Sequence, residues 1–297
     1  MKVFMYRLRL IAMLSIALLL GACASPLRTS LTPEQRGKVT ELTAHVVVVQ
    51  DEVIAAVQPS TAGAANGLIG AMIDSHITNN RVKESQSALG PFYAAIEDVD
   101  YRKEFNESIQ KELSAYPIKI SRFTTTPRFV SKDELARLRS DLQPGQALLV
   151  ILPRYTLSMD FRTFDVESMV GIWLRPGESD SQMPSQCGQI RYQSAPVGPG
   201  DRESLALWAA QGAAPFRNAM RESIAETVRM VMLDIDVAAK APDEKNLQTF
   251  PFNQGMGKGE IKGQVLKTGN GRAILLGSDM KLYSLPHSGS LATTAQQ

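Results

Sequence analysis

The chain has 297 residues, of which 44% are hydrophobic and 21% charged, and its 32 Lys and Arg against 30 Asp and Glu give a formal net charge of +2. A chain of this length buries a sizeable core, alone or beside a small second unit. The chain is nearly neutral and has no dense stripe of basic residues, which argues against nucleic acid as a partner.

The first 22 residues have the pattern of a secretory signal peptide. Lys2, Arg7 and Arg9 precede the apolar run Leu10–Leu20, which is too short to span a bilayer comfortably. Removing these three of the 32 basic residues leaves 29 against 30 acidic ones, so the remaining chain has a net charge of −1.

The apolar run ends in Leu20-Gly21-Ala22-Cys23, which resembles the lipobox of bacterial lipoproteins. The resemblance implies removal of residues 1–22, transfer of diacylglycerol to Cys23, and acylation of the new amino terminus with palmitate. More than one acyl chain gives stable membrane anchoring. Ala24 stands where an aspartate usually retains such proteins at the inner membrane, which implies a periplasm-facing anchor in the Gram-negative outer membrane. The alternative is an ordinary secretory signal with an incidental cysteine.

Residues 23–31 are expected to form the lipidated terminus and a tether, followed by a main domain over 32–240. Thr32, Pro33 and Gln35 match the start of a helix with a capping box. The β-branched stretch that follows, AHVVVVQDEVIAAVQ, predicts one strand or two, the two forming a hairpin around Gln50-Asp51.

Residues 53–73 carry no charge and contain Gly63, Gly67 and Gly70 at spacings of four and three. On a helix these glycines would share one face, which allows close approach of another backbone. We expect this face to pack inside its own domain. The alternatives are a membrane-seeking segment or an oligomer contact.

The middle of the chain predicts a helix and a long hairpin. Apolar residues recur every four positions over 100–116, as in an amphipathic helix. The run Ala147–Leu152 predicts a buried strand, and the alternation after it continues that strand. The apolar phase shifts near Arg162-Thr163, so we expect a turn there and an antiparallel partner strand.

Residues 201–210 and 213–237 predict helices, the second with an apolar stripe from Phe216 to Ile235. We expect a linker over 241–258, a small three-stranded β unit over 259–286, and a disordered tail over 287–297. The Gly269-Asn270-Gly271 sequence predicts a tight turn within the β unit.

This order of elements predicts an α+β fold, with helices packed on a mixed or antiparallel sheet, plus a small C-terminal β-meander. Over residues 38–237 the order resembles the envelope domains of CsgG, LpoB and the amino-terminal part of TolB. There ALLVILPRYTLSMDF would be the central strand leading into a hairpin. Such domains mostly bind proteins, so the resemblance implies an envelope protein partner; it leaves the oligomeric state open.

The sequence contains no recognisable catalytic residue, metal site or cofactor motif. His45, His76 and His287 are not spaced with other metal ligands. With Cys23 lipidated, Cys187 has no intramolecular partner, so it is incidental, forms an intermolecular disulfide or is a reactive thiol. Three carboxylate pairs keep glycosidic chemistry open: Asp98 with Asp100, Asp160 with Asp165, and Asp234 with Asp236.

Tyr155, Phe161, Arg162 and Phe164 combine residue types that are enriched at binding hot spots. They are candidates for partner binding, although the favoured interpretation is that the aromatic rings fill the core and the arginine is solvated. The expected function is a membrane-anchored, non-enzymatic adaptor or assembly factor of the cell envelope. The alternatives are a periplasmic hydrolase of an envelope polymer and an oligomeric export or pore component.

Overall fold

The computed structural model describes residues 28–50, 53–55, 89–97, 101–177, 183–236, 241–253 and 258–287. The helices are α2 (Pro33–Lys38), α4 (Gly90–Ala94), α5 (Tyr101–Ser114), α6 (Lys132–Ser140), α7 (Asp201–Asp236) and the 3₁₀ helix η2 (Glu244–Asn246). The strands are β1 (Glu41–Val47), β2 (Ile54–Ala55), β3 (Lys119–Thr126), β4 (Gln146–Leu157), β5 (Phe164–Leu174), β6 (Gln186–Gln193), β7 (Leu247–Asn253), β8 (Lys258–Gly269), β9 (Arg272–Gly277) and β10 (Leu282–Pro286).

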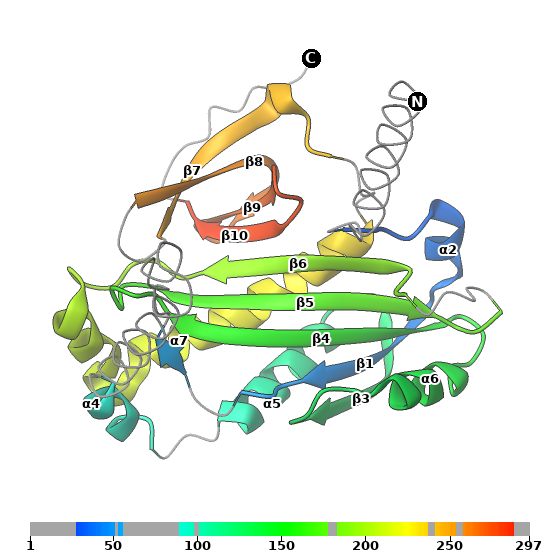
Figure 1. The fold of residues 1–297 in the computed structure, drawn as a ribbon, viewed down its shortest axis with the longest axis horizontal. Coiled ribbons are helices and arrows are strands. Elements are labelled where there is room, and N and C mark those ends of the chain that lie inside the picture. Colours follow the sequence, from blue (N-terminus) through cyan, green and yellow to red (C-terminus); the bar gives the residue numbers. More distant parts are fainter. Residues whose placement is uncertain are drawn as a thin grey trace, which may run out of the picture.

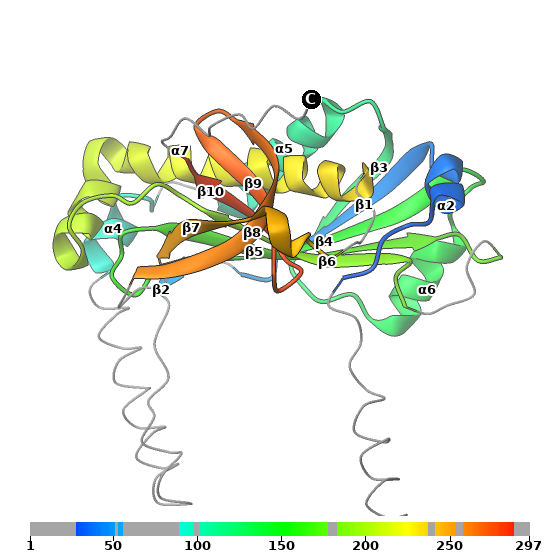
Figure 2. The same cartoon turned by 90° about the horizontal axis from the view of Figure 1, so that it is seen from above.

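These strands form one mixed sheet in the order β3-β1-β4-β5-β6-β10-β9-β8-β7, with β2 added to β4. Strand β1 is parallel to β3 and β4, and β10 is parallel to β6, whereas β4, β5 and β6 are antiparallel neighbours. Helices α4, α5 and α7 lie on one face of the sheet (Figures 1 and 2). The predicted α+β class is therefore confirmed.

The long hairpin is the centre of the sheet. Strands β4 and β5 pair without interruption from Ala147 and Leu174 to Leu157 and Phe164. The turn between them includes Phe161 at a φ of 55°. The apolar run Ala147–Leu152, which predicted a buried strand, therefore lies in β4, which has a neighbouring strand on each edge.

Helix α7 contributes more residues to the core than α4 or α5 does. Its stripe Phe216, Met220, Ile224, Val228, Val231 and Ile235 is buried throughout. Non-helical backbone at Ala210–Ala213 divides α7 into two helical parts, as the sequence predicted. The amphipathic helix α5 buries Phe105, Ile109 and Leu113 in the same core.

The tether is shorter than the sequence predicted. Thr29 forms an antiparallel bridge with Cys187, and Leu31 is part of the hydrophobic core. Residues 28–31 therefore belong to the folded domain, because both backbone pairing and apolar burial hold them to it.

The C-terminal strands differ from the predicted linker and separate meander. The expected linker, 241–258, contains η2 and β7, and β7 pairs with β8, so the unit has a fourth strand. Strand β10 pairs in parallel with β6, which makes the unit a continuation of the main sheet. His287, placed in the tail by the sequence analysis, donates its backbone N–H to Gly271.

None of the helices in these ranges is long and apolar enough to cross a membrane. Several sequence-based predictions concern residues outside the part of the chain that the structure describes. These are the lipidation site Cys23, the face made by Gly63, Gly67 and Gly70, the residues His76, Asp98 and Asp100, and the tail beyond His287.

Candidate partner-binding surface

The face of the sheet opposite α7 is the candidate binding surface. Along β4 the core-facing residues Leu149 and Ile151 alternate with Val150 and Leu152, which are only partly buried. On β5 the corresponding exposed residue is Met169, paired in register with Leu152. Apolar residues therefore point away from the core at the middle of the sheet.

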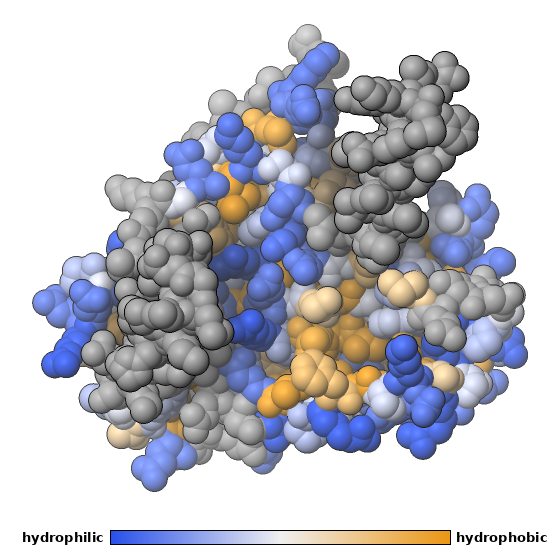
Figure 3. Space-filling view, viewed as in Figure 1, coloured by the Kyte–Doolittle hydropathy of each residue, from blue (hydrophilic) through white to orange (hydrophobic). Residues whose placement is uncertain are grey.

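We call this surface the open face, made of Val49, Val150, Leu152, Met169 and Trp173. Met169 is 56% exposed and Val49 is 36% exposed. Figure 3 shows apolar side chains gathered over the central strands on this side of the molecule. Contiguous exposed apolar surface of this kind marks interaction sites more often than isolated apolar residues do.

Charged side chains border the open face near β6 and β10. Arg154 on β4 lies opposite Glu167 on β5 in the strand register, and Lys281 forms an ion pair with Glu167 at 3.6 Å. Arg191 of β6 lies over the Phe252 ring, 4.5 Å from its centroid. Asp165 and Asp279 lie near Arg191 as well, so this border carries charges of both signs.

The residues that the sequence singled out for partner binding lie elsewhere. Tyr155, Phe161 and Phe164 are 4%, 7% and 1% exposed, so their rings fill the core and are not an exposed hot spot. The remaining residue, Arg162, donates from Nε to the Gly198 carbonyl at 3.1 Å. The alternative reading, in which the aromatic rings pack inside, is the correct one.

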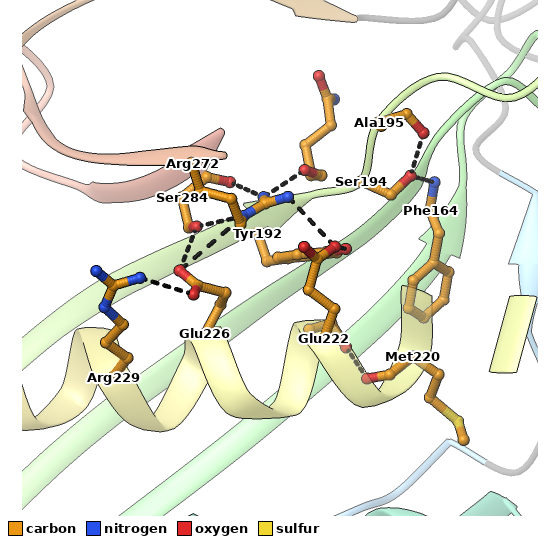
Figure 4. Close-up of polar contacts among 12 residues, drawn as sticks. Phe164, Tyr192, Ser194, Ala195, Met220, Glu222, Glu226, Arg229, Arg272 and Ser284 are labelled. Carbon is orange, nitrogen blue, oxygen red and sulfur yellow. Dashed lines mark hydrogen bonds and ion pairs between the residues drawn. The ribbon is translucent and has the colours of Figure 1, made fainter. Parts of the chain in front are cut away.

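A buried arginine fixes the C-terminal strands to the main domain (Figure 4). The Arg272 guanidinium lies over the Tyr192 ring, 4.3 Å from its centroid. It donates to Ser284 Oγ at 2.9 Å, to the Gln193 carbonyl at 2.6 Å and to Glu222 Oε2 at 3.3 Å. One side chain thus joins β9, β10, β6 and α7.

Acidic groups of α7 complete this arginine network. Glu222 also accepts from the Tyr192 hydroxyl, and Glu226 accepts from Ser284 Oγ at 2.7 Å and from Arg229 at 3.0 Å. A buried guanidinium needs this number of acceptors, because an unpaired buried charge is strongly destabilising. The network is therefore structural: its groups satisfy one another.

A second polar cluster joins the end of β7 to β5 and β6. Asp165 accepts from Gln193 Nε2 at 2.7 Å and from Thr163 Oγ1 at 3.2 Å. Gln193 in turn pairs with the backbone of Asn253, whose side chain donates to Asp160 at 3.1 Å. Burial raises the pKa of Asp165 to about 6, against the lowering effect of Arg191 and its two hydrogen bonds.

The Asp165 carboxyl makes stability depend on pH. Because its folded-state pKa is raised above the ordinary value of 3.8, its stabilising contribution is complete below about pH 4 and is lost as the pH rises through about 6. In Asp165→Asn, the loss of unfolding free energy between about pH 4.5 and 7.5 should be smaller than in wild type by about 2 kcal/mol. Urea unfolding at both pH values measures this; equal losses in the two proteins would contradict it.

The other residues that the sequence analysis considered for chemistry make contacts within the fold. His45 is buried with Nδ1 2.7 Å from Thr124 Oγ1, and burial lowers its pKa. Cys187 donates its backbone N–H to Thr29 Oγ1 at 2.9 Å and is half-buried. Asp160 and Asp165 do meet in one cluster. Asp234 is buried and paired with Arg28.

Within the described ranges, no group of three or more His, Cys, Asp or Glu could hold a metal ion. The sequence offered no signal for the open face beyond alternation on β5, because strands β1 and β4 look continuously apolar. Arg272 was missed as well, since a single arginine after a turn is indistinguishable in sequence from a solvated one.

No family model matches the chain, and no curated protein matches it. Among solved structures, it is similar to protein XCC0632 from Xanthomonas campestris, of family DUF330, with 11% identity and a TM-score of 0.30. The match covers 70% of this chain and 92% of that one. At this TM-score the likeness carries no conclusion about the chain.

Proposed function

We propose that the protein is a lipid-anchored adaptor or assembly factor of the Gram-negative outer membrane, facing the periplasm, without enzymatic activity. It binds an envelope protein through the open face. The observation that carries the proposal is the exposed apolar surface at the centre of the sheet, with Met169 56% exposed. The Leu20–Cys23 sequence, which resembles a lipobox, supports the membrane anchor.

The border of the open face suggests the chemistry of the partner. Apolar side chains at the centre favour a partner segment with apolar anchors. The cations Arg154, Arg191 and Lys281 are matched there by the anions Glu167, Asp165 and Asp279, so the border favours neither sign of charge in the partner. The partner segment is therefore expected to present apolar side chains to the open face.

The polar clusters support a binding role more than catalysis. The Arg272 network and the Asp165 cluster are both occupied by contacts between structural elements. A catalytic constellation needs groups that are free to meet a substrate in a pocket. The clusters instead hold the C-terminal strands and the central hairpin in place, which keeps the open face rigid.

Substituting Met169 by aspartate tests this role. The Met169→Asp variant should bind the purified partner about tenfold more weakly or worse, because a charge at a central anchor costs more than 1.4 kcal/mol. Its stability should change by less than about 0.5 kcal/mol, since the side chain is exposed. The partner is first identified by co-purification from detergent-solubilised envelopes, and affinity is then measured with purified components.

Leu207→Asp is the matched control. Leu207 is 44% exposed and lies on the first part of α7, at the end of the sheet near α4 (Figure 1). This variant should bind as wild type does. If both substitutions weakened partner binding equally, or if neither weakened it, binding through the open face would be contradicted.

A further inference from the structure

The chain enters the folded domain at a buried ion pair. Arg28 contacts Asp234 near the end of α7, and the two side chains are 0% and 1% exposed. Burial raises the pKa of Asp234, while the Arg28 guanidinium opposes this effect. A pair this buried is costly to separate, because either partner alone would be an uncompensated charge.

The next residue is fixed by the sheet. Thr29 donates its backbone N–H to the Cys187 carbonyl at 2.9 Å and accepts from the Cys187 N–H at 3.2 Å. Its hydroxyl also accepts from the Cys187 N–H at 2.9 Å. The entry point therefore lies at the start of β6 and is held by both side-chain and backbone contacts.

Only four residues, 24–27, separate Arg28 from the lipidation site Cys23. Five Cα-to-Cα steps reach about 17 Å when fully extended. The 11 residues of β5 span about twice that distance, roughly 35 Å. A lipid on Cys23 thus cannot be far from the start of β6, whereas the opposite end of the sheet lies well beyond its reach.

The geometry points to one end of the domain, that of α2 and the start of β6, as a surface that rests on the phospholipid bilayer. This inference depends on the proposed anchor at Cys23. Figure 1 shows α2, the end of β5 and the start of β6 together at this end, with α4 at the other. Met183, 59% exposed just before β6, would contact the lipid.

The short tether supports this orientation more strongly than the charge of the membrane end does. Lys38 and Arg175 are at the membrane end, but Glu34 and Asp236 are there as well, so the end is not strongly basic. The consequence is an orientation: the open face extends from the bilayer into the periplasm. A partner would then approach from the side of the domain.

Fluorescence quenching by lipid tests this orientation. The mature lipoprotein, with Cys187→Ser, carries one dye on a cysteine at position 183, 169 or 207. The sulfur of Cys23 is a thioether once lipidated and does not react. Each protein is reconstituted into vesicles of phosphatidylethanolamine and phosphatidylglycerol with a headgroup quencher.

Quenching should be strongest at 183, intermediate at 169 and weakest at 207, with about threefold between the extremes because they lie tens of ångströms apart. Inserting about 20 Gly and Ser residues between Ala24 and Ser25 should reduce quenching at 183, since such a linker adds roughly 25 Å. Equal quenching at the three positions, or strongest quenching at 207, on vesicle-bound protein would overturn the orientation alone. Protein whose mass shows no acyl chains and that does not bind vesicles would overturn the anchor itself.

Discussion

The Arg272→Ala variant should lose about 3–5 kcal/mol of unfolding free energy. The substitution removes the guanidinium that links Ser284, the Gln193 carbonyl and Glu222. It leaves the half-exposed Glu222 without its cation, and the buried Glu226 keeps only Arg229, at the junction between α7 and the C-terminal strands. Lost pairing of buried charges, rather than lost volume, is the main cause.

Urea unfolding followed by circular dichroism measures this loss. Arg202→Ala, at an exposed position in the same helix α7, should change stability by less than about 0.5 kcal/mol. Arg272→Lys should recover part of the loss only, because an ammonium cannot make the forked contacts of a guanidinium. A cost for Arg272→Ala no greater than that for Arg202→Ala would show that the network does not hold the C-terminal strands.

Phe216→Ala should be similarly destabilising, by about 3–5 kcal/mol. Its ring lies edge-on to Phe92 at 4.9 Å, to Phe164 at 5.0 Å and to Trp208 at 6.3 Å between centroids. These rings come from α4, β5 and both parts of α7. A cavity here would loosen the helical layer from the central hairpin.

Thermal unfolding of Phe216→Ala and Phe129→Ala compares a core ring with an exposed one. Phe129 is 65% exposed, so its removal should shift the melting temperature little. A melting temperature for Phe216→Ala close to that of wild type would refute the assignment of this aromatic cluster as the centre of the core.

The sequence predicted the elements well where periodicity and turn chemistry agreed. The capping box at Thr32 and Gln35, the helix stripe from Phe216, and the positive φ values at Gly269–Gly271 are all present in the structure. Each depends on local interactions or on one apolar face, which a single sequence displays directly.

Pairings between distant segments could not be predicted in this way. Strand β1 lies parallel to both β3 and β4, and β2 pairs with β4 in the same direction, so this region is not a hairpin. Between β1 and β2, the Gln50 side chain bonds to the N–H and carbonyl of Tyr155, at 3.1 and 2.6 Å. The Gln50 amide thus makes the hydrogen bonds that a neighbouring strand would make, and no pattern in the sequence predicts this.

The site residues show the same limit. Tyr155, Phe161 and Phe164 have the composition of a binding hot spot, yet the sheet turns them toward α5 and α7. Which residues of β4 and β5 face outward depends on the helices covering the other side, and these are remote in sequence. The open face therefore emerged from the tertiary structure alone.

The central claim is that an anchored domain binds an envelope protein through its open face. Photo-crosslinking in living cells tests it most directly, with the crosslinking amino acid at position 169 or 207, in the wild-type chain and in Cys23→Ala. The account predicts that one envelope protein is crosslinked from position 169, but neither from position 207 nor in Cys23→Ala. This envelope protein should also bind the purified domain. Identical products from both positions, crosslinks only to a second copy of the chain, or capture unaffected by Cys23→Ala would contradict it.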